Sequence, residues 1–220
     1  QKFNIITITL KSYYNYVKCI DILAENYKID VYHNRGTMRV ISGSARGTKL
    51  NSINSISTRP TLDRVKESLF NILQNKIQDS IVLDLFAGSG AIAIEFLSRG
   101  AQKAYLCEKN HLATQMIYSN LEKTKLTSKA VIIGKDYQKT LKILQQEKVK
   151  FDIVYIDPPY QANIAVKALQ MILSLNLLKE KGILIIETDD EKRELLELEK
   201  LEVQVVDIRK YGRVSLIFLT

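Results

Sequence analysis

The sequence predicts an α/β fold: a mostly parallel, seven-stranded sheet with helices on both faces, ending in an antiparallel hairpin. Two observations predict it. From Ile81 onward, short apolar runs alternate with helix-like stretches, which is typical of a parallel sheet with crossover helices. The last two apolar runs are joined only by residues 209–213, and a glycine-containing link that short makes a hairpin.

The seven strands are expected at Ile81–Phe86, Ala104–Cys107, Ala130–Ile133, Phe151–Ile156, Ile183–Glu187, Val203–Ile208 and Val214–Leu219. The helices between them are expected near Ala91–Arg99, His111–Lys123, Tyr137–Gln146, Asn163–Ser174 and Asp190–Lys200. Five parallel strands followed by a terminal hairpin is the pattern of a Class I methyltransferase (Rossmann-like) fold. An ordinary dinucleotide-binding fold ends in a parallel strand instead.

Upstream of this pattern, Thr61 is expected to cap a helix from Leu62 to about Asn75, whose apolar residues recur at helical spacing. Before that helix, residues 39–57 read as short strands or as an extended arm that turns at Gly43 and Gly47. We therefore divide the chain into an N-terminal extension (1–37), a basic arm with its helix (38–76) and a methyltransferase-like domain (77–220).

Composition is that of a soluble globular protein, with 46% hydrophobic and 25% charged residues. No stretch approaches the roughly 18 apolar residues of a membrane-spanning helix. Cys19 and Cys107 have neither metal-like nor disulfide-like spacing, and no cluster of histidines, cysteines and carboxylates suggests a metal. We expect a cytoplasmic protein without a metal cofactor.

The net charge of +8 is unevenly distributed. Residues 38–66 contain one acid, Asp63, and six basic residues: Arg39, Arg46, Lys49, Arg59, Arg64 and Lys66. Such a concentration favours a surface that faces phosphates, although a solvated basic face is the alternative.

A glycine turn follows the first strand, at residues 83–90. Gly88 and Gly90 let the backbone approach a ligand at a helix start, where backbone N–H groups are free. With Ala93 this segment also fits the G-x-G-x-x-G/A dinucleotide fingerprint. However, Asp84 would repel a pyrophosphate, whereas its carboxylate suits the cationic amino group of S-adenosylmethionine.

Two more carboxylates follow the next strands. Glu108 ends the second strand, where an acid can accept hydrogen bonds from both ribose hydroxyls of a cofactor. Asp136 follows the third strand and is placed to bond the adenine amino group. Each could equally be an ordinary strand-end carboxylate, and it is their succession beside a glycine turn that favours a cofactor site.

The tetrapeptide Asp157-Pro158-Pro159-Tyr160 follows the fourth strand. Methylation of an exocyclic base nitrogen needs acceptors for the amine and a ring to hold the base. Asp157 and a backbone carbonyl stiffened by Pro158 provide the acceptors, and Tyr160 provides the ring. The alternative is a turn that ends a buried strand.

These motifs closely resemble the RsmD family of bacterial methyltransferases, which modify guanine N2 in 16S ribosomal RNA. The resemblance extends from about Met38 to Thr220. It is carried by residues 38–43, 58–70, 84–90, 95–101, 108–109, 157–160 and 210–212, and the Thr-Arg-Pro-Thr block at 58–61 is its family-specific element.

The resemblance implies a role for each matching residue. Cofactor binding is implied for Asp84, Phe86, Gly88, Gly90, Glu108 and Asp136. Asp157, Pro158 and Tyr160 would hold the guanine, and Arg39, Arg46, Arg59 and Arg64 would face RNA. Three departures, Ala93, Phe96 and Tyr137, concern helix packing or the wall of the adenine pocket.

The expected partner is 16S rRNA within an assembling small ribosomal subunit, and a monomer is expected. Two alternatives remain open: a DNA adenine-N6 methyltransferase using the same tetrapeptide, and a catalytically inactive RNA-binding assembly factor. Residues 1–37 have no counterpart in the family, and we expect them to be upstream sequence ahead of a natural start at Met38.

Overall fold

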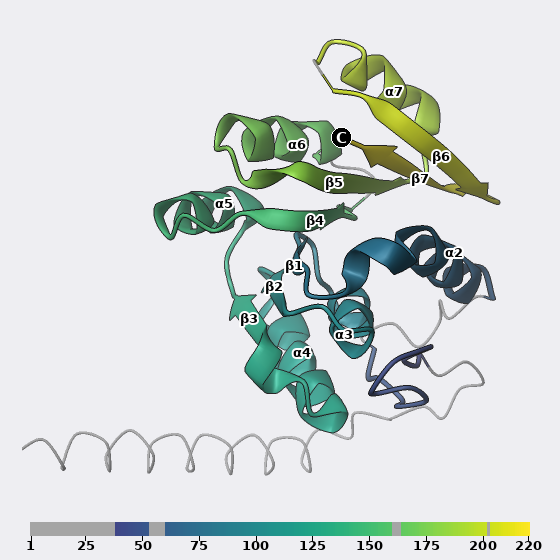
Figure 1. Ribbon diagram of the computed structural model, residues 1–220, viewed down its shortest axis with the longest axis vertical. Helices are drawn as coiled ribbons and strands as arrows, with labels where there is room; N and C mark the ends of the chain where they lie inside the picture. Colours follow the sequence, from purple (N-terminus) through teal and green to yellow (C-terminus); the bar gives the residue numbers. More distant parts are fainter. Residues whose placement is uncertain (1–37, 53–59, 160–163, 202) are drawn as a thin grey trace, which may run out of the picture. The chain divides into compact units, whose positions relative to one another are not determined.

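The computed structural model describes residues 38–52, 60–159, 164–201 and 203–220, with side chains described from residue 64 in the second segment (Figure 1). The extension 1–37 and the predicted site residues Arg59 and Tyr160 therefore lie outside the described residues.

The described part contains one seven-stranded sheet with strand order β3-β2-β1-β4-β5-β7-β6. The strands are β1 Ile81–Asp84, β2 Lys103–Cys107, β3 Ala130–Ile133, β4 Phe151–Ile156, β5 Leu178–Thr188, β6 Val205–Tyr211 and β7 Val214–Leu219. The first five strands pair in parallel, and β7 runs antiparallel between β5 and β6. The predicted fold class and the terminal hairpin are confirmed.

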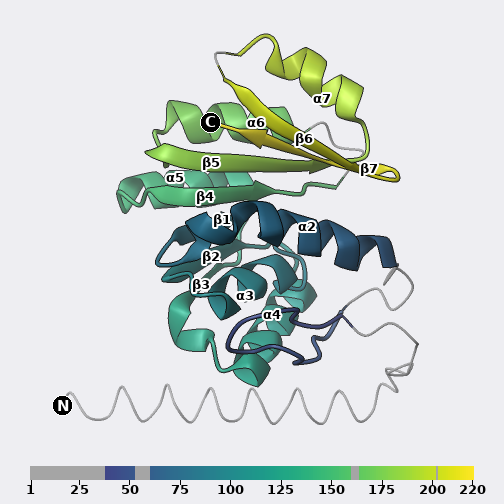
Figure 2. The same ribbon diagram turned by 45° about the vertical axis from the view of Figure 1, so that its right-hand side comes forward.

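Helices cover both faces of this sheet (Figures 1 and 2). They are α2 Pro60–Ile77, α3 Ala91–Ser98, α4 His111–Thr124, α5 Tyr137–Gln146, α6 Ala165–Ser174 and α7 Glu191–Leu198, with a 3-10 turn at Thr127–Lys129. Helices α2, α3 and α4 bury their apolar sides in one core, which includes Phe70 and Phe96. Helices α5, α6 and α7 pack in a second core around Leu144 and Leu169.

Several boundaries differ from the prediction, three of them with a structural consequence. Strand β5 begins at Leu178, ahead of the expected Ile183. The hairpin turn is only Gly212-Arg213, because Tyr211 pairs directly with Val214. Helix α2 begins at Pro60, so Thr61 lies inside the helix rather than capping it. A proline suits a first helical position, since its missing N–H would have no partner there.

The segment 38–51 forms an extended arm and not a pair of strands, because its β contact with the described residues is an isolated bridge between Arg39 and Lys49. Instead, the arm bonds to α3. The amides of Ile41 and Ser42 donate to the Glu95 carboxylate at 2.8 and 2.9 Å. Val40 is buried on the same arm.

No helix among the described residues is both long and apolar enough to cross a membrane.

Candidate cofactor and substrate site

A cavity of about 190 Å³ lies at the carboxyl ends of β1, β4 and β5. Strand ends contribute four lining residues: Asp84, Tyr155, Asp157 and Glu187. The glycine turn and α3 contribute Phe86, Ala87, Gly88, Ser89, Ala91 and Ile92. The arm and α2 close it with Met38, Val65 and Lys66. The predicted cofactor residues Asp84, Phe86 and Gly88 therefore share one cavity with the predicted catalytic residue Asp157.

Asp84 is the last residue of β1, and only 2% of its surface is exposed. Its Oδ2 accepts a hydrogen bond from the Ala93 amide at 3.3 Å. The pKa of Asp84 is raised to about 7, mainly by burial and also by the charges of Glu108 and Glu187, while backbone hydrogen bonds oppose the rise. A cationic ligand in the cavity would supply a counter-charge, so this carboxyl fits the amino group of S-adenosylmethionine.

Gly90 allows the glycine turn to lie flat against β2 and α4. It caps α3 in the left-handed region at φ 78°, which favours glycine. A Cβ at this position would lie 3.2 Å from Leu106 Cδ2 and 3.3 Å from Ile117 Cγ1. Gly90 thus determines how the turn packs against β2 and α4, and it does not line the cavity.

Glu108 holds the turn in place from the end of β2. Its Oε2 accepts from the Gly88 amide at 3.0 Å, and its Oε1 accepts from the Asn110 amide at 2.7 Å. Each carboxylate oxygen can accept a second hydrogen bond, so these contacts leave capacity for ribose hydroxyls.

Asp136 lies outside the cavity lining. It caps α5, with Oδ1 accepting from the Lys139 amide at 3.0 Å, and it pairs with the Lys139 ammonium at 3.3 Å. That backbone hydrogen bond holds the pKa of Asp136 below its usual value. Next to it, the Tyr137 ring lies 5.6 Å from the Phe86 ring, between centroids.

Asp157 follows β4 and faces two other acids. The pKa of Asp157 is well above its usual range, first because of burial and then because of the charges of Glu187 and Asp84. The Tyr155 hydroxyl donates a hydrogen bond to Glu187 Oε2. The ring of Pro158 is buried, so the turn after Asp157 is held by packing.

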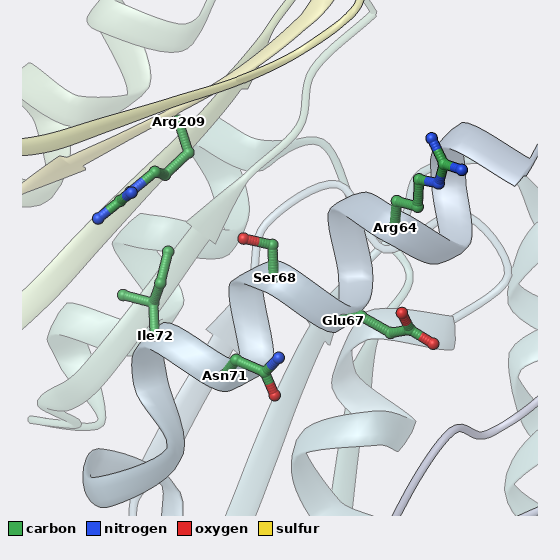
Figure 3. A pocket seen from close by; sticks show the side chains of 6 residues that line it. All are labelled: Arg64, Glu67, Ser68, Asn71, Ile72 and Arg209. Atoms are coloured by element: carbon green, nitrogen blue, oxygen red, sulfur yellow. The ribbon is translucent and has the colours of Figure 1, made fainter.

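The three predicted RNA-facing arginines that the structure describes occupy two places. Arg39 and Arg46 are exposed on the arm. Arg64 is exposed on α2 and lines a second hollow of about 440 Å³, with Glu67, Ser68, Asn71, Ile72 and Arg209 (Figure 3). Figure 3 shows Ile72 pointing from α2 towards Arg209 on β6. These arginines do not line the cofactor cavity.

Sequence reasoning missed Met38, Lys66, Tyr155 and Glu187 as cavity residues. For Glu187 a signal existed: it lies near the carboxyl end of β5, as Asp84 and Asp157 do for β1 and β4. Met38 and Lys66 had none, because only the folded chain brings the arm and α2 to the sheet, and Tyr155 belongs to the predicted apolar strand Phe151–Ile156.

Comparison with known proteins agrees with this geometry. The sequence profile of the family described as "Conserved hypothetical protein 95" matches residues 38–220. The chain belongs to this family. It is 39% identical over 168 residues to the Ribosomal RNA small subunit methyltransferase D of Haemophilus influenzae, covering 75% of this chain and 86% of the relative. It is 38% identical to the Putative rRNA methyltransferase YlbH of Bacillus subtilis, covering 70% and 84%.

Solved structures agree with the fold. A putative methyltransferase from Escherichia coli, yhhF, superposes with a TM-score of 0.69 at 28% identity, covering 84% of this chain and 97% of that chain. A putative methylase from Haemophilus influenzae gives a TM-score of 0.66 at 32% identity, covering 84% and 98%. The resemblance to the RsmD family and the Class I methyltransferase fold are therefore confirmed.

In the part of the chain that the structure describes, no group of three or more histidines, cysteines and carboxylates has the geometry of a metal site.

Proposed function

We propose that this protein transfers a methyl group from S-adenosylmethionine to the exocyclic N2 of a guanine in 16S ribosomal RNA. One observation carries the proposal: a single cavity joins the buried Asp84 and the glycine turn to Asp157. The family relatives named as small-subunit rRNA methyltransferases support the choice of rRNA.

On the cofactor side, Asp84 would accept hydrogen bonds from the amino group, and Glu108 would accept them from the ribose. The turn at Gly88 brings backbone close to the ligand. Asp136 would reach the adenine amino group only by sharing its oxygens with the cap of α5. When bound, S-adenosylmethionine supplies an electrophilic methyl group on a sulfonium.

On the substrate side, Asp157 and the Pro158 carbonyl would accept hydrogen bonds from the guanine amine. An exocyclic amine is a poor nucleophile because its lone pair is delocalised into the ring. Two acceptors aimed at its N–H bonds favour the pyramidal geometry in which the lone pair is available. Tyr160 would stack on the base. The amine becomes strongly acidic once it carries the new methyl group, so Asp157 or water would take the proton.

RNA would approach over the basic arm and α2, with Arg39, Arg46, Arg59 and Arg64 facing phosphates. We place the reaction in the cytoplasm on an assembling small subunit, with the enzyme acting as a monomer.

The decisive experiment offers radiolabelled S-adenosylmethionine with small-subunit particles, naked 16S rRNA or duplex DNA, followed by nucleoside analysis. Label in N2-methylguanosine is expected. Label in N6-methyladenine would replace this function by DNA methylation, and RNA binding without label would indicate an inactive assembly factor.

The matching variant is Asp157→Ala. We expect turnover on rRNA to fall by at least about 100-fold, since an acceptor aimed at the reacting amine is lost, while cofactor affinity stays within about threefold. Asp189→Ala, which removes an exposed acid just beyond β5, is the control and should keep full turnover. Near-normal turnover of Asp157→Ala would refute the assigned role.

A further inference from the structure

The cavity contains a second substrate-side carboxylate, which the proposed reaction has not used. Glu187 lines the cavity together with Asp157, and 5% of its surface is exposed. Strands β4 and β5 pair in parallel with Ile156 opposite Ile186, so Asp157 and Glu187 occupy the next row on neighbouring strands. Neighbouring strands lie about 4.8 Å apart, so both carboxylates are within reach of one base.

The position of the Glu187 side chain is set by the protein. Its Oε2 accepts the hydrogen bond from the Tyr155 hydroxyl, and Tyr155 is itself 1% exposed. A carboxylate has about four acceptor sites, so Glu187 can accept from more than one donor. Glu187 is therefore a preoriented acceptor at the cavity wall.

The cavity is rich in acceptors. Among the described residues, three carboxylates line it (Asp84, Asp157 and Glu187), together with one cationic side chain, Lys66. Asp84 lies on the glycine-turn side. The remaining pair, Asp157 and Glu187, therefore presents acceptors to whatever group enters from the substrate side.

Guanine presents the matching edge. Its N1–H and its N2 amine are adjacent donors on the Watson–Crick edge. Adenine has an amine beside an N1 acceptor, and cytosine has an amine beside an N3 acceptor. Uracil has an N3–H between two carbonyls and no amine. The donors of guanine favour the ionised, acceptor-only form of both carboxyls, so the pair fits guanine and opposes the other three bases.

We propose that Glu187 reads the base, accepting a hydrogen bond from guanine N1–H while Asp157 holds the N2 amine. This inference rests on the proposed function and gives it a source of base specificity. Glu187 selects and positions the base, and Tyr155 acts through Glu187. A buried acceptor built for one donor strongly rejects an analogue that lacks the donor, because the polar group is then left without its partner.

The test uses 2-aminopurine, which keeps the C2 amine but presents a lone pair at N1. Wild-type labelling first maps the target guanine, and an RNA substrate is then assembled with guanine or 2-aminopurine at that position. We expect the wild-type kcat/KM to be at least about 100-fold lower on 2-aminopurine. Comparable values on both bases would overturn the proposal without any variant.

The variant Glu187→Gln tests the residue itself. A glutamine amide can donate to N1 of 2-aminopurine, so the preference for guanine should shrink to about tenfold or less. Glu191→Gln is the matched control: Glu191 follows β5 and accepts a bond from the Ser215 hydroxyl, but it does not line the cavity, so it should keep the full preference. If kcat/KM of Glu187→Gln fell by the same factor on guanine and on 2-aminopurine, the role of Glu187 would be structural and the proposal would be overturned.

A second variant, Tyr155→Phe, keeps the ring and removes the hydroxyl that orients Glu187. It should reduce the preference for guanine by more than about threefold, and an unchanged preference would contradict the orienting role. The two proposals fail differently. If wild type produces no N2-methylguanosine, the proposed function fails. If it does and the base preference is insensitive to both variants, only the role of Glu187 fails.

Discussion

At the scale of single residues, the site is built around acids that the fold keeps out of water. Asp84 is enclosed at the end of β1, where burial favours the protonated carboxyl and raises its pKa to about 7. A cationic ligand reverses that balance, because it stabilises the ionised form. The buried Asp84 carboxyl therefore destabilises the protein without a ligand and contributes to the affinity for a cationic one.

The cost of burying Asp84 should appear as a pH dependence of stability. Between the unfolded pKa of 3.8 and the folded value of about 7, the native state holds a proton that the unfolded state has lost. Stability should therefore fall as pH rises through this window and level off above it. Asp84→Asn removes the titration, so its stability relative to wild type should increase by about 2 kcal/mol from pH 5 to pH 8.

Urea unfolding of the cofactor-free protein at about pH 5 and pH 8 measures this difference. The exposed Asp79→Asn, in the turn before β1, is the control and should show much less pH dependence relative to wild type. The same Asp84→Asn protein should bind S-adenosylmethionine at least about tenfold more weakly. A stability difference that does not change with pH would contradict the buried, protonated carboxyl.

At the scale of elements, the arm and the cofactor turn share their supports. Glu95 on α3 is fully buried; besides the arm amides it contacts Arg99 Nε at 2.8 Å and Lys66 Nζ at 3.7 Å. Asn120 on α4 donates to the carbonyls of both Asn51 and Ser89, at 3.0 and 2.9 Å. The segment expected to face RNA is therefore tied to the turn expected to hold the cofactor.

Gly43 brings the backbone of the arm close to α3. Its φ is 84°, and a Cβ there would lie 1.8 Å from the Ser98 carbonyl oxygen. Gly47 has nearly the same φ, 82°, and a Cβ there would meet nothing within 4 Å. Gly47→Ala should cost about 1 kcal/mol for the left-handed backbone alone, and Gly43→Ala at least about twice that.

Hydrogen exchange distinguishes the two variants locally. The amides of Ser44 and Ala45 donate to the Ser98 carbonyl and hydroxyl oxygens at 2.8 and 2.9 Å. In Gly43→Ala these amides, and those bonded to Glu95, should exchange at least about tenfold faster, while Gly47→Ala should leave them close to wild type. Equal exchange in both variants would mean that the arm is not held through this contact.

The difference between local sequence pattern and tertiary contacts explains which parts of the structure the sequence could predict. The strands of the sheet carry their own apolar periodicity, so the strands, their mostly parallel pairing and the hairpin followed from local pattern and topology rules. The arm has no such periodicity. Its conformation depends instead on contacts with Glu95 and Ser98, which the sequence does not reveal. Asp136 illustrates the other difficulty: a carboxylate after a strand is also a good helix cap, and the sequence alone does not separate the two roles.

At the scale of the whole molecule, exposed arginines lie on several elements that meet on the α2 side of the sheet. Exposed Arg39 and Arg46 belong to the arm, and Arg64 belongs to α2. The β6–β7 hairpin adds exposed Arg209, Lys210 and Arg213, and it is joined to α2 by a hydrogen bond between the Ser68 and Tyr211 hydroxyls. Arg209 also pairs with Asp207 at 2.8 Å, which reduces its share in any phosphate contact.

If the arm contacts RNA phosphates, its arginines should determine part of the salt dependence of binding. Each phosphate contact releases counterions, so log Kd changes with log salt concentration by about 0.7 per contact on single-stranded nucleic acid. The double variant Arg39→Gln/Arg46→Gln should therefore lower the slope by about 1.4 and weaken binding most at low salt. Lys142→Gln/Lys148→Gln removes the same charge from exposed positions on α5 and the turn after it, and should leave the slope near the wild-type value.

Titration of a 16S rRNA fragment between about 50 and 200 mM salt measures both slopes. Equal reductions in the two double variants would show that net charge, and not the arm, governs RNA binding.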